Sequence, residues 1–343
     1  MNFYANNEKG RNKIKLYDYI RSKYILIQIF DNLHKRKILN IIKFNKNIKN
    51  RIDVGVKDYK ECSEKYSSIE IEIIPINNKY GQFINIKEED KKYYHIYFND
   101  NKEEIKRNYF DENDKVSKIK IIIDYQVKSF NELFYWCKYI EIIRFKKFYR
   151  INIIEMRDMF YNCESLKELD LNNFNTNNVF DMAGMFQGCS SLKQLNLSNF
   201  NTSKVRDMNF MFYGCSSLKE LNLSKFNTSE VTQMSMMFYG CSSLKELNLS
   251  NFNTNNVFEM GFMFAKCSSL KELNLNNFNT NNVFDMKYMF SDCSSELCSK
   301  IRFRYKNIKG DAFYGANKND HSNILSIICL IVILSIFIKK IIK

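Results

Sequence analysis

Ten cysteines, three histidines and a recurring set of carboxylates are the side chains of this 343-residue chain that could do chemistry. A zinc site requires closely spaced ligand pairs such as C-x-x-C, and only Cys293 and Cys298 approach that spacing, with no histidine near them. Most of the cysteines instead follow one another at intervals of 26 residues: Cys137, Cys163, Cys189, Cys215, Cys241, Cys267 and Cys293. This regularity is typical of small, buried, apolar side chains, so the sequence predicts neither a metal nor a cofactor.

The histidines and carboxylates do not predict an enzyme. His34, His95 and His321 lie outside the repeated region, and none stands beside a candidate nucleophile. The carboxylates recur at equal intervals, whereas catalysis requires one singular arrangement of side chains. We therefore predict no catalytic residues, and interpret the recurring polar side chains as a strand face that is either solvated or in contact with a protein or peptide partner. These partner-binding candidates are Glu168, Asp170, Gln194, Asn196, Glu220, Asn222, Glu246, Asn248, Glu272 and Asn274.

The elements that position these side chains are repeats of 26 residues, such as the copy that begins CSSLKELNLSNFNT at Cys241. The first half of each copy contains the pattern L-x-x-L-x-L, whose alternation indicates a half-buried strand. In the second half, apolar residues stand three or four positions apart, which is a helical or 3₁₀ spacing. Because one such unit cannot cover its own apolar side, neighbouring copies must stack. The sequence thus predicts an α/β repeat, a solenoid with a parallel β-sheet and short helices.

The array of repeats extends over residues 127–305. A degenerate first copy, with Val127, Phe130 and Cys137 on the same register, is interpreted as a cap that hides the open end of the core. At the other end the pattern breaks after Cys293, and the following residues are interpreted as a closing cap. Residues 61–126 are predicted to be a small strand-rich connecting region, with its strands at 67–76, 92–98 and 118–124.

The pattern M-F-x-x-C-x-S-L-K-x-L-x-L-x-x-F-x-T-x-x-V-x-x-M resembles that of BspA-like leucine-rich-repeat proteins of bacterial surfaces and some protists. The resemblance covers residues 127–305. It implies a leucine-rich-repeat solenoid with a binding or adhesion role, and it carries over no catalytic residues. This chain departs from the commonest leucine-rich repeat in having Phe174 and its equivalents where Asn or Cys often stands.

Residues 1–60 are basic and have no repeat, and residues 14–52 carry apolar side chains at helical spacing. Two or three amphipathic helices are expected there. The spacing of the apolar residues over 22–52 also resembles an F-box, on the residues Ile25, Leu26, Ile29, Phe30, Leu33, Ile38 and Leu39. This resemblance implies an alternative function, a substrate adaptor of a ubiquitin ligase whose residues 14–52 bind a Skp-type linker protein.

Residues 324–338, ILSIICLIVILSIFI, contain no charged side chain and follow a polar linker over 306–322. As a helix, 15 residues rise about 22 Å, less than a hydrocarbon core of about 30 Å, and this length alone favours a buried helix. Only Ser326 and Ser335 are polar, however, so the helix would be apolar on all sides. We therefore predict that residues 323–343 form a single-pass C-terminal membrane anchor, with the repeats facing the cytosol.

The distribution of charge argues against a nucleic-acid-binding protein. The formal net charge is +14, but the excess of Lys and Arg lies near the two ends, and the array is nearly neutral. Basic ends suit an anionic membrane surface or a solvated face. We expect a non-catalytic protein-binding scaffold that its tail holds to a membrane; the alternatives are the F-box-type adaptor and a surface adhesin.

Overall fold

Alternating isoleucines form the first strand of the described part of the chain, which comprises residues 67–150 and 152–316 of a computed structural model. Every second residue of β1 (Ile69–Pro75) is buried, as expected for a strand with one face on a core. The helices predicted within residues 14–52, including the F-box-like segment, lie outside the described residues, as does the apolar segment 324–338.

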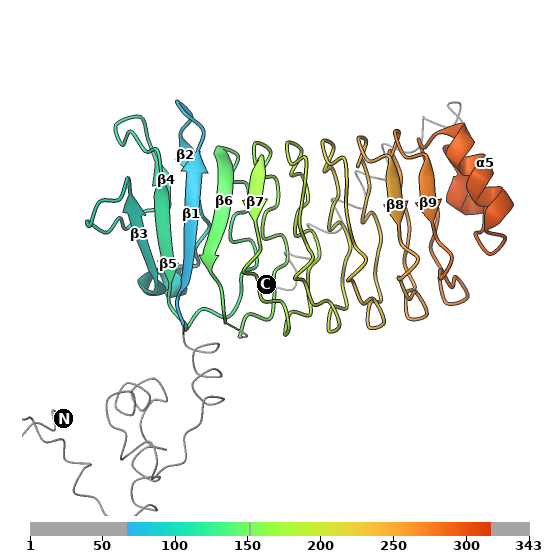
Figure 1. The fold of residues 1–343 in the computed structure, drawn as a ribbon, viewed down its shortest axis with the longest axis horizontal. Coiled ribbons are helices and arrows are strands. Elements are labelled where there is room, and N and C mark those ends of the chain that lie inside the picture. The colour runs from blue at the N-terminus through green and yellow to red at the C-terminus, as the bar shows by residue number, and fades with distance from the viewer. Residues whose placement is uncertain (1–66, 151, 317–343) are drawn as a thin grey trace, which may run out of the picture. The chain divides into compact units, whose positions relative to one another are not determined.

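β1 is the central strand of a five-stranded sheet with the order β3-β5-β1-β6-β7 (Figure 1). β5 (Ile119–Ile123) lies antiparallel to β1 on one side and to β3 (Tyr94–Phe98) on its own other side. On the second side of β1 lies β6 (Ile140–Lys147), also antiparallel. The strands predicted at 67–76, 92–98 and 118–124 are thus confirmed.

The first repeats join this sheet directly. β7 (Glu168–Asp170) pairs in parallel with β6, so that Leu169 lies opposite Ile143, its counterpart one repeat earlier. The strands before the array and the first strands of the array therefore share one sheet. A small separate sheet pairs β2 (Gly81–Gln82) with β4 (Tyr109–Phe110), and the 3₁₀ helix η2 (Glu88–Tyr93) precedes β3.

Successive repeats are in register with one another at the beginning of their second halves. Parallel bridges between equivalent positions of neighbouring repeats link Ser129, Glu155, Asp181, Asp207, Gln233, Glu259 and Asp285 in sequence. Each coil therefore lies next to its neighbours in the chain, as the sequence predicts for copies that cannot bury their apolar sides alone.

On the leucine side the strands are shorter and less continuous than predicted. β8 (Glu246–Asn248) and β9 (Glu272–Asn274) form a second parallel pair, but residues 194–196 and 220–222 are not strands. Side chains explain the short length, because Oδ1 of Asn248 and Oδ1 of Asn274 each accept a hydrogen bond from the backbone N–H two residues further on and so close a turn. With three residues per strand, few ladder bonds hold each pair together.

The prediction of short helices in the second half of each repeat is wrong. These segments are turns, whose backbone N–H groups bond to the next coil; the Phe212 N–H, for example, donates to the Met237 carbonyl over 2.9 Å. Two positions per repeat have a positive φ, such as Phe210 at 58° and Gly214 at 70°. A left-handed residue cannot continue a right-handed helix, so the apolar spacing of three and four is used by turns instead.

The core is built from columns of equivalent side chains. Rings of Phe160 and its equivalents stack from coil to coil, with centroids 5.5–5.7 Å apart through Phe290. The described cysteines are free and buried, and from Cys163 to Cys293 the thiol of each repeat donates to a phenylalanine carbonyl of the previous coil, as from Cys241 to Phe212 over 3.2 Å. Burial raises the pKa of Cys215 to about 12, so its thiol is protonated at neutral pH.

One polar column accompanies the apolar ones. The Thr228 hydroxyl donates to the Asn253 carbonyl over 2.9 Å and accepts from the Asn253 N–H over 2.8 Å. The same pair of bonds recurs in the neighbouring coils. A buried hydroxyl is tolerated here because both of its hydrogen-bonding capacities are used.

A helix and a 3₁₀ turn close the far end of the array. Ser294 is the N-cap of α5 (Ser295–Arg304), because its side chain accepts a hydrogen bond from the Leu297 N–H, and η3 (Gly310–Phe313) follows the helix. Residues 301–303 of the predicted closing cap belong to this helix, with Ile301 buried and Phe303 exposed. Although 306–322 was predicted to be a polar linker, Ala312 and Phe313 within it are buried. Among the described residues, no helix is long and apolar enough to cross a membrane.

Candidate functional site

The partner-binding candidates flank the buried leucines of the strand rows. Leu221, Leu247 and Leu273 point into the core, and the residues before and after each of them are exposed or half-buried. This alternation follows from strand geometry, in which successive side chains point to opposite faces. The ten candidates therefore form two rows on one surface, one mainly of glutamates and one mainly of asparagines.

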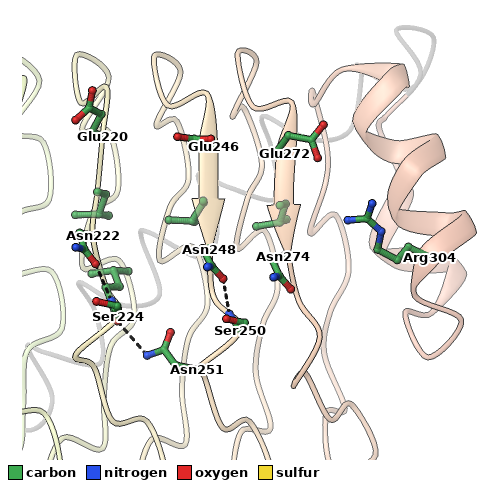
Figure 2. A pocket seen from close by; sticks show the side chains of 14 residues that line it. Glu220, Asn222, Ser224, Glu246, Asn248, Ser250, Asn251, Glu272, Asn274 and Arg304 are labelled. Atoms are coloured by element: carbon green, nitrogen blue, oxygen red, sulfur yellow. Dashed lines mark hydrogen bonds between the residues drawn. The ribbon is translucent and has the colours of Figure 1, made fainter.

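Part of this surface is hollowed next to α5. We call it the sheet-face hollow; its volume is about 580 Å³. Figure 2 shows the glutamate row and the asparagine row of three successive coils along it, with Arg304 of α5 at one end. Six of the ten predicted residues line the hollow: Glu220, Asn222, Glu246, Asn248, Glu272 and Asn274. The four candidates nearer the start of the array, Glu168, Asp170, Gln194 and Asn196, do not line it.

The asparagine row has a structural role in addition to its place in the hollow. Asn222 and Asn248 each accept a hydrogen bond from a serine N–H two residues later, over 3.0 Å (Figure 2). Their carbonyl oxygens are therefore used in Asx turns. The amide NH₂ groups at the other end of these side chains supply donors to the hollow.

The glutamate row is paired at its two ends. Arg144 of β6 contacts Glu168 over 2.8 Å and Glu72 of β1 over 3.1 Å. At the other end, Lys300 of α5 contacts Glu272 over 2.9 Å. A hydrogen bond from Lys300, and then its charge, lowers the pKa of Glu272 below the usual 4.5.

Between these ends, Glu220 and Glu246 are exposed and form no ion pair with another described residue. Both line the hollow. Two neighbouring carboxylates without a cation partner in the described part of the chain give the middle of the hollow a negative charge at neutral pH, while Arg304 puts one positive charge at its edge.

Sequence reasoning missed four polar lining residues: Ser224, Ser250, Asn251 and Arg304. The serines and Asn251 belong to the repeat pattern and could have been found by following each strand two or three residues further. Arg304 lies in the closing cap, where the 26-residue pattern has ended, and only the helical turn of α5 brings it to the hollow. Asn251 donates to the carbonyls of Leu223 and Phe226, so it fixes the floor of the hollow.

The chemistry available in the hollow is recognition through charge and hydrogen bonding. Carboxylates, amides, hydroxyls and one guanidinium line it together with four leucines, and no thiol or imidazole does. Within residues 67–150 and 152–316, no group of three or more His, Cys, Asp or Glu is arranged to hold a metal ion.

The comparisons with known proteins agree with a repeated chain. A family model described as "Mycoplasma protein of unknown function, DUF285" matches twice in succession, over residues 128–221 and 217–322. The two matches together span more than half of the chain and cover every residue that lines the hollow. No curated protein and no solved structure matches the chain.

Proposed function

This chain belongs to the family described as "Mycoplasma protein of unknown function, DUF285", and we propose that it is a non-catalytic scaffold whose sheet-face hollow binds a segment of a protein or peptide. The observation that carries the proposal is the pair of exposed carboxylates, Glu220 and Glu246, beside a row of asparagine amides. Exposed like charges on neighbouring coils repel each other, so a cationic ligand relieves that repulsion. The partner segment is therefore one that carries lysine or arginine.

We further propose that the array is a leucine-rich-repeat solenoid of the BspA-like type. Its support is the set of parallel bridges between equivalent positions of successive repeats, together with the columns of Leu, Phe and Cys. Stacked coils of this kind offer long surfaces suited to extended polypeptide partners.

Membrane attachment through residues 324–338 is a second part of the proposal. Its support is the sequence itself, an apolar run without a charge, followed by lysines that can reach a headgroup layer. Flotation of the full chain with anionic vesicles, compared with a chain that lacks residues 323–343, tests it. Equal flotation of both chains would contradict attachment through this segment.

Selection of peptides from a displayed random library against the full chain tests binding in the hollow. We expect the selected peptides to be rich in lysine and arginine. In fluorescence polarisation with one selected peptide, the double variant Glu220→Arg, Glu246→Arg should bind up to about thirtyfold more weakly, since each of the two contacts is worth up to about 1 kcal/mol.

The matched control is Glu230→Arg, which reverses an exposed carboxylate of the same repeat outside the hollow. It should leave affinity nearly unchanged. Selected peptides without basic residues, or equal losses in the control and the double variant, would contradict the proposed site.

A further inference from the structure

A second hollow lies in the strand-rich part of the chain before the array. We call it the edge pocket, because it adjoins β3, the edge strand of the five-stranded sheet (Figure 1). Its volume is about 470 Å³, which is within the range of small-molecule sites. Its lining comes from residue 86, η2, β3 and residues 105–109, and it shares no residue with the sheet-face hollow.

The backbone beside β3 explains why space remains there. The Ile105 N–H donates to the Ile96 carbonyl over 2.8 Å, and this contact is an isolated antiparallel bridge rather than part of a continuous ladder. On the other side of the pocket, β3 begins directly after η2, whose last turn carries Lys91 and Lys92. An isolated bridge holds the two segments together at one point, so a pocket can open next to it.

The floor of the edge pocket is apolar. Tyr94 and Ile96 of β3 line it and belong to the main core. Ile86 and Ile105 pack against that core but are only half-buried, so part of each side chain faces the pocket. Apolar surface that stays open in a concave site favours a ligand that removes it from water. The floor therefore suits a ligand with an apolar body.

The charged side chains of the lining all have the same sign. Four cations line the pocket, Lys91, Lys92, Lys106 and Arg107, and no carboxylate does. They form two adjacent pairs in the sequence, one before and one after β3, and only the fold brings the pairs together. Residues 88–90 and 103–104 are all acidic, yet none of them lines the pocket. A lining with one sign of charge favours a ligand of the opposite sign.

Two of the four cations are paired with carboxylates that stand outside the lining. Arg107 donates to Asp114 and lies 3.6 Å from the Asp111 carboxylate, so its guanidinium is fixed in place. Lys106 contacts Glu104 over 2.6 Å. These two side chains therefore form a positively charged wall, and a ligand anion gains less from them than from a cation without a partner.

The two lysines of η2 are the better receptors for an anion. Lys91 contacts Glu88 over 2.7 Å, but these side chains are 51% and 83% exposed, and an ion pair so exposed contributes little. Lys92 is exposed and forms no ion pair with another described residue. Its ammonium lies 4.9 Å from the centroid of the Tyr93 ring. An anionic group that enters the pocket therefore gains most at Lys92, with Lys91 next to it in the sequence.

We propose that the edge pocket binds a small amphipathic anion. Its single carboxylate or phosphate group lies at Lys92 and Lys91, and its apolar body covers Ile86 and Ile105. This inference goes beyond the proposed binding of a basic peptide segment in the sheet-face hollow. The two sites use different residues and take ligands of opposite charge, so either proposal can fail without the other.

Isothermal titration calorimetry of the full chain tests the class of ligand. Decanoate and decyl phosphate are the probes, since they carry the two anionic groups on one apolar tail, and both are used below the concentrations at which they form micelles. We expect at least one of them to bind, and the tighter one identifies the preferred group. Butyrate, which has the carboxylate but a shorter tail, should bind more weakly than decanoate. If neither decanoate nor decyl phosphate binds, the proposal is overturned.

A charge reversal tests the place of the anionic group. Lys92→Glu should weaken binding of the tighter anion by about fivefold, the size of one exposed ion pair. It should not weaken binding of decyltrimethylammonium, which carries a cation on the same tail. The matched control is Lys102→Glu, at an exposed lysine outside the lining, and it should leave the affinity nearly unchanged. Equal losses in the two variants, or no loss in Lys92→Glu, would overturn the proposal.

Photolabelling locates the apolar body without any substitution in the chain. Decanoate with a diazirine at the end of its tail is irradiated with the full chain, and mass spectrometry identifies the labelled peptides after digestion. The label should fall on peptides that contain Ile86 or Ile105, and an excess of unmodified decanoate should suppress it. Labelling confined to the array or to residues 324–338 would show that the tail binds elsewhere and would overturn the proposal.

Discussion

Lys300 of α5 pairs with Glu272 of β9 over 2.9 Å, so the cap helix sets the charge at one end of the sheet-face hollow. Lys300 also contacts Glu296 of its own helix over 3.0 Å. Of the three glutamates that line the hollow, Glu272 thus has a cation partner, whereas Glu220 and Glu246 form no ion pair with another described residue. The cap therefore decides where along the surface a cationic ligand is favoured.

Removing this cation should strengthen binding of a basic peptide. In Lys300→Ala, the Glu272 carboxylate loses its partner, its pKa should rise toward the usual 4.5, and a third free carboxylate should face the hollow. Titration by NMR of the Glu272 carboxyl and fluorescence polarisation with a basic peptide measure both effects. The control Lys306→Ala removes another exposed lysine after α5. An unchanged pKa would show that Lys300 does not hold Glu272.

Acid should destabilise the five-stranded sheet through Glu72. Burial raises the pKa of this carboxyl, but hydrogen bonds and charges from Arg144 and Lys146 outweigh it, so the pKa lies below 4.5 in the folded chain. A lowered folded pKa means that the stabilisation is complete above the unfolded pKa and is lost as the pH falls through the folded pKa. We expect Glu72→Gln to lose less thermal stability between about pH 6 and about pH 3 than the parent chain. Glu89→Gln, at an exposed position, should behave as the parent does.

The buried polar column formed by Thr228 and its equivalents should keep its stability better with serine than with valine. Thr228→Val keeps the shape of the side chain but removes both bonds to Asn253, which leaves a backbone donor and acceptor without that partner. The expected loss in the free energy of unfolding is about 1–3 kcal/mol. Thr228→Ser keeps both bonds and loses one methyl group, about 1 kcal/mol. Urea unfolding measures both variants, and a larger loss for serine would contradict this role of the hydroxyl.

Two glycines at equivalent positions should respond differently to alanine. Gly188 and Gly214 have φ of 74° and 70°, so alanine at either position meets the left-handed penalty of roughly 1–2 kcal/mol. At Gly214 the nearest atom to an added methyl group is 3.7 Å away, whereas at Gly188 the methyl group would overlap Asn162 Oδ1. Gly188→Ala should therefore lower the unfolding free energy more than Gly214→Ala. Equal losses would show that the Asn162 side chain moves away from the added methyl group without lowering the unfolding free energy.

Strands and buried positions could be predicted from the sequence because they depend on local alternation. Ile69, Ile71 and Ile73 alternate with other residues, and the structure buries all three in β1. The recurrence of one Cys and of the pattern L-x-x-L-x-L from repeat to repeat likewise predicted columns of buried side chains. Six of the ten candidates fell in the hollow for the same reason, since residues on either side of a buried strand leucine face outward.

The turns could not be predicted by the same reasoning. Apolar residues three and four apart, such as Met208, Met211 and Phe212, are compatible with a helix, and the sequence does not show that Phe210 between them has a positive φ. That conformation is stabilised by hydrogen bonds to the next coil, such as the one from the Phe210 N–H to the Ser235 carbonyl over 3.0 Å. Contacts between repeats here override the local spacing.

By itself, the sequence determined that copies of one unit stack in order. It also determined which side chains the copies bury. Both properties follow from the spacing of apolar residues within one copy. The tertiary structure decided which side chains of the cap and of successive repeats lie next to one another. It brought Arg304 and Lys300 to the end of the glutamate row and aligned the left-handed turn residues of successive coils into one surface. Such neighbours are set by the rise from one coil to the next and by the angle of the closing helix, and no single repeat encodes either.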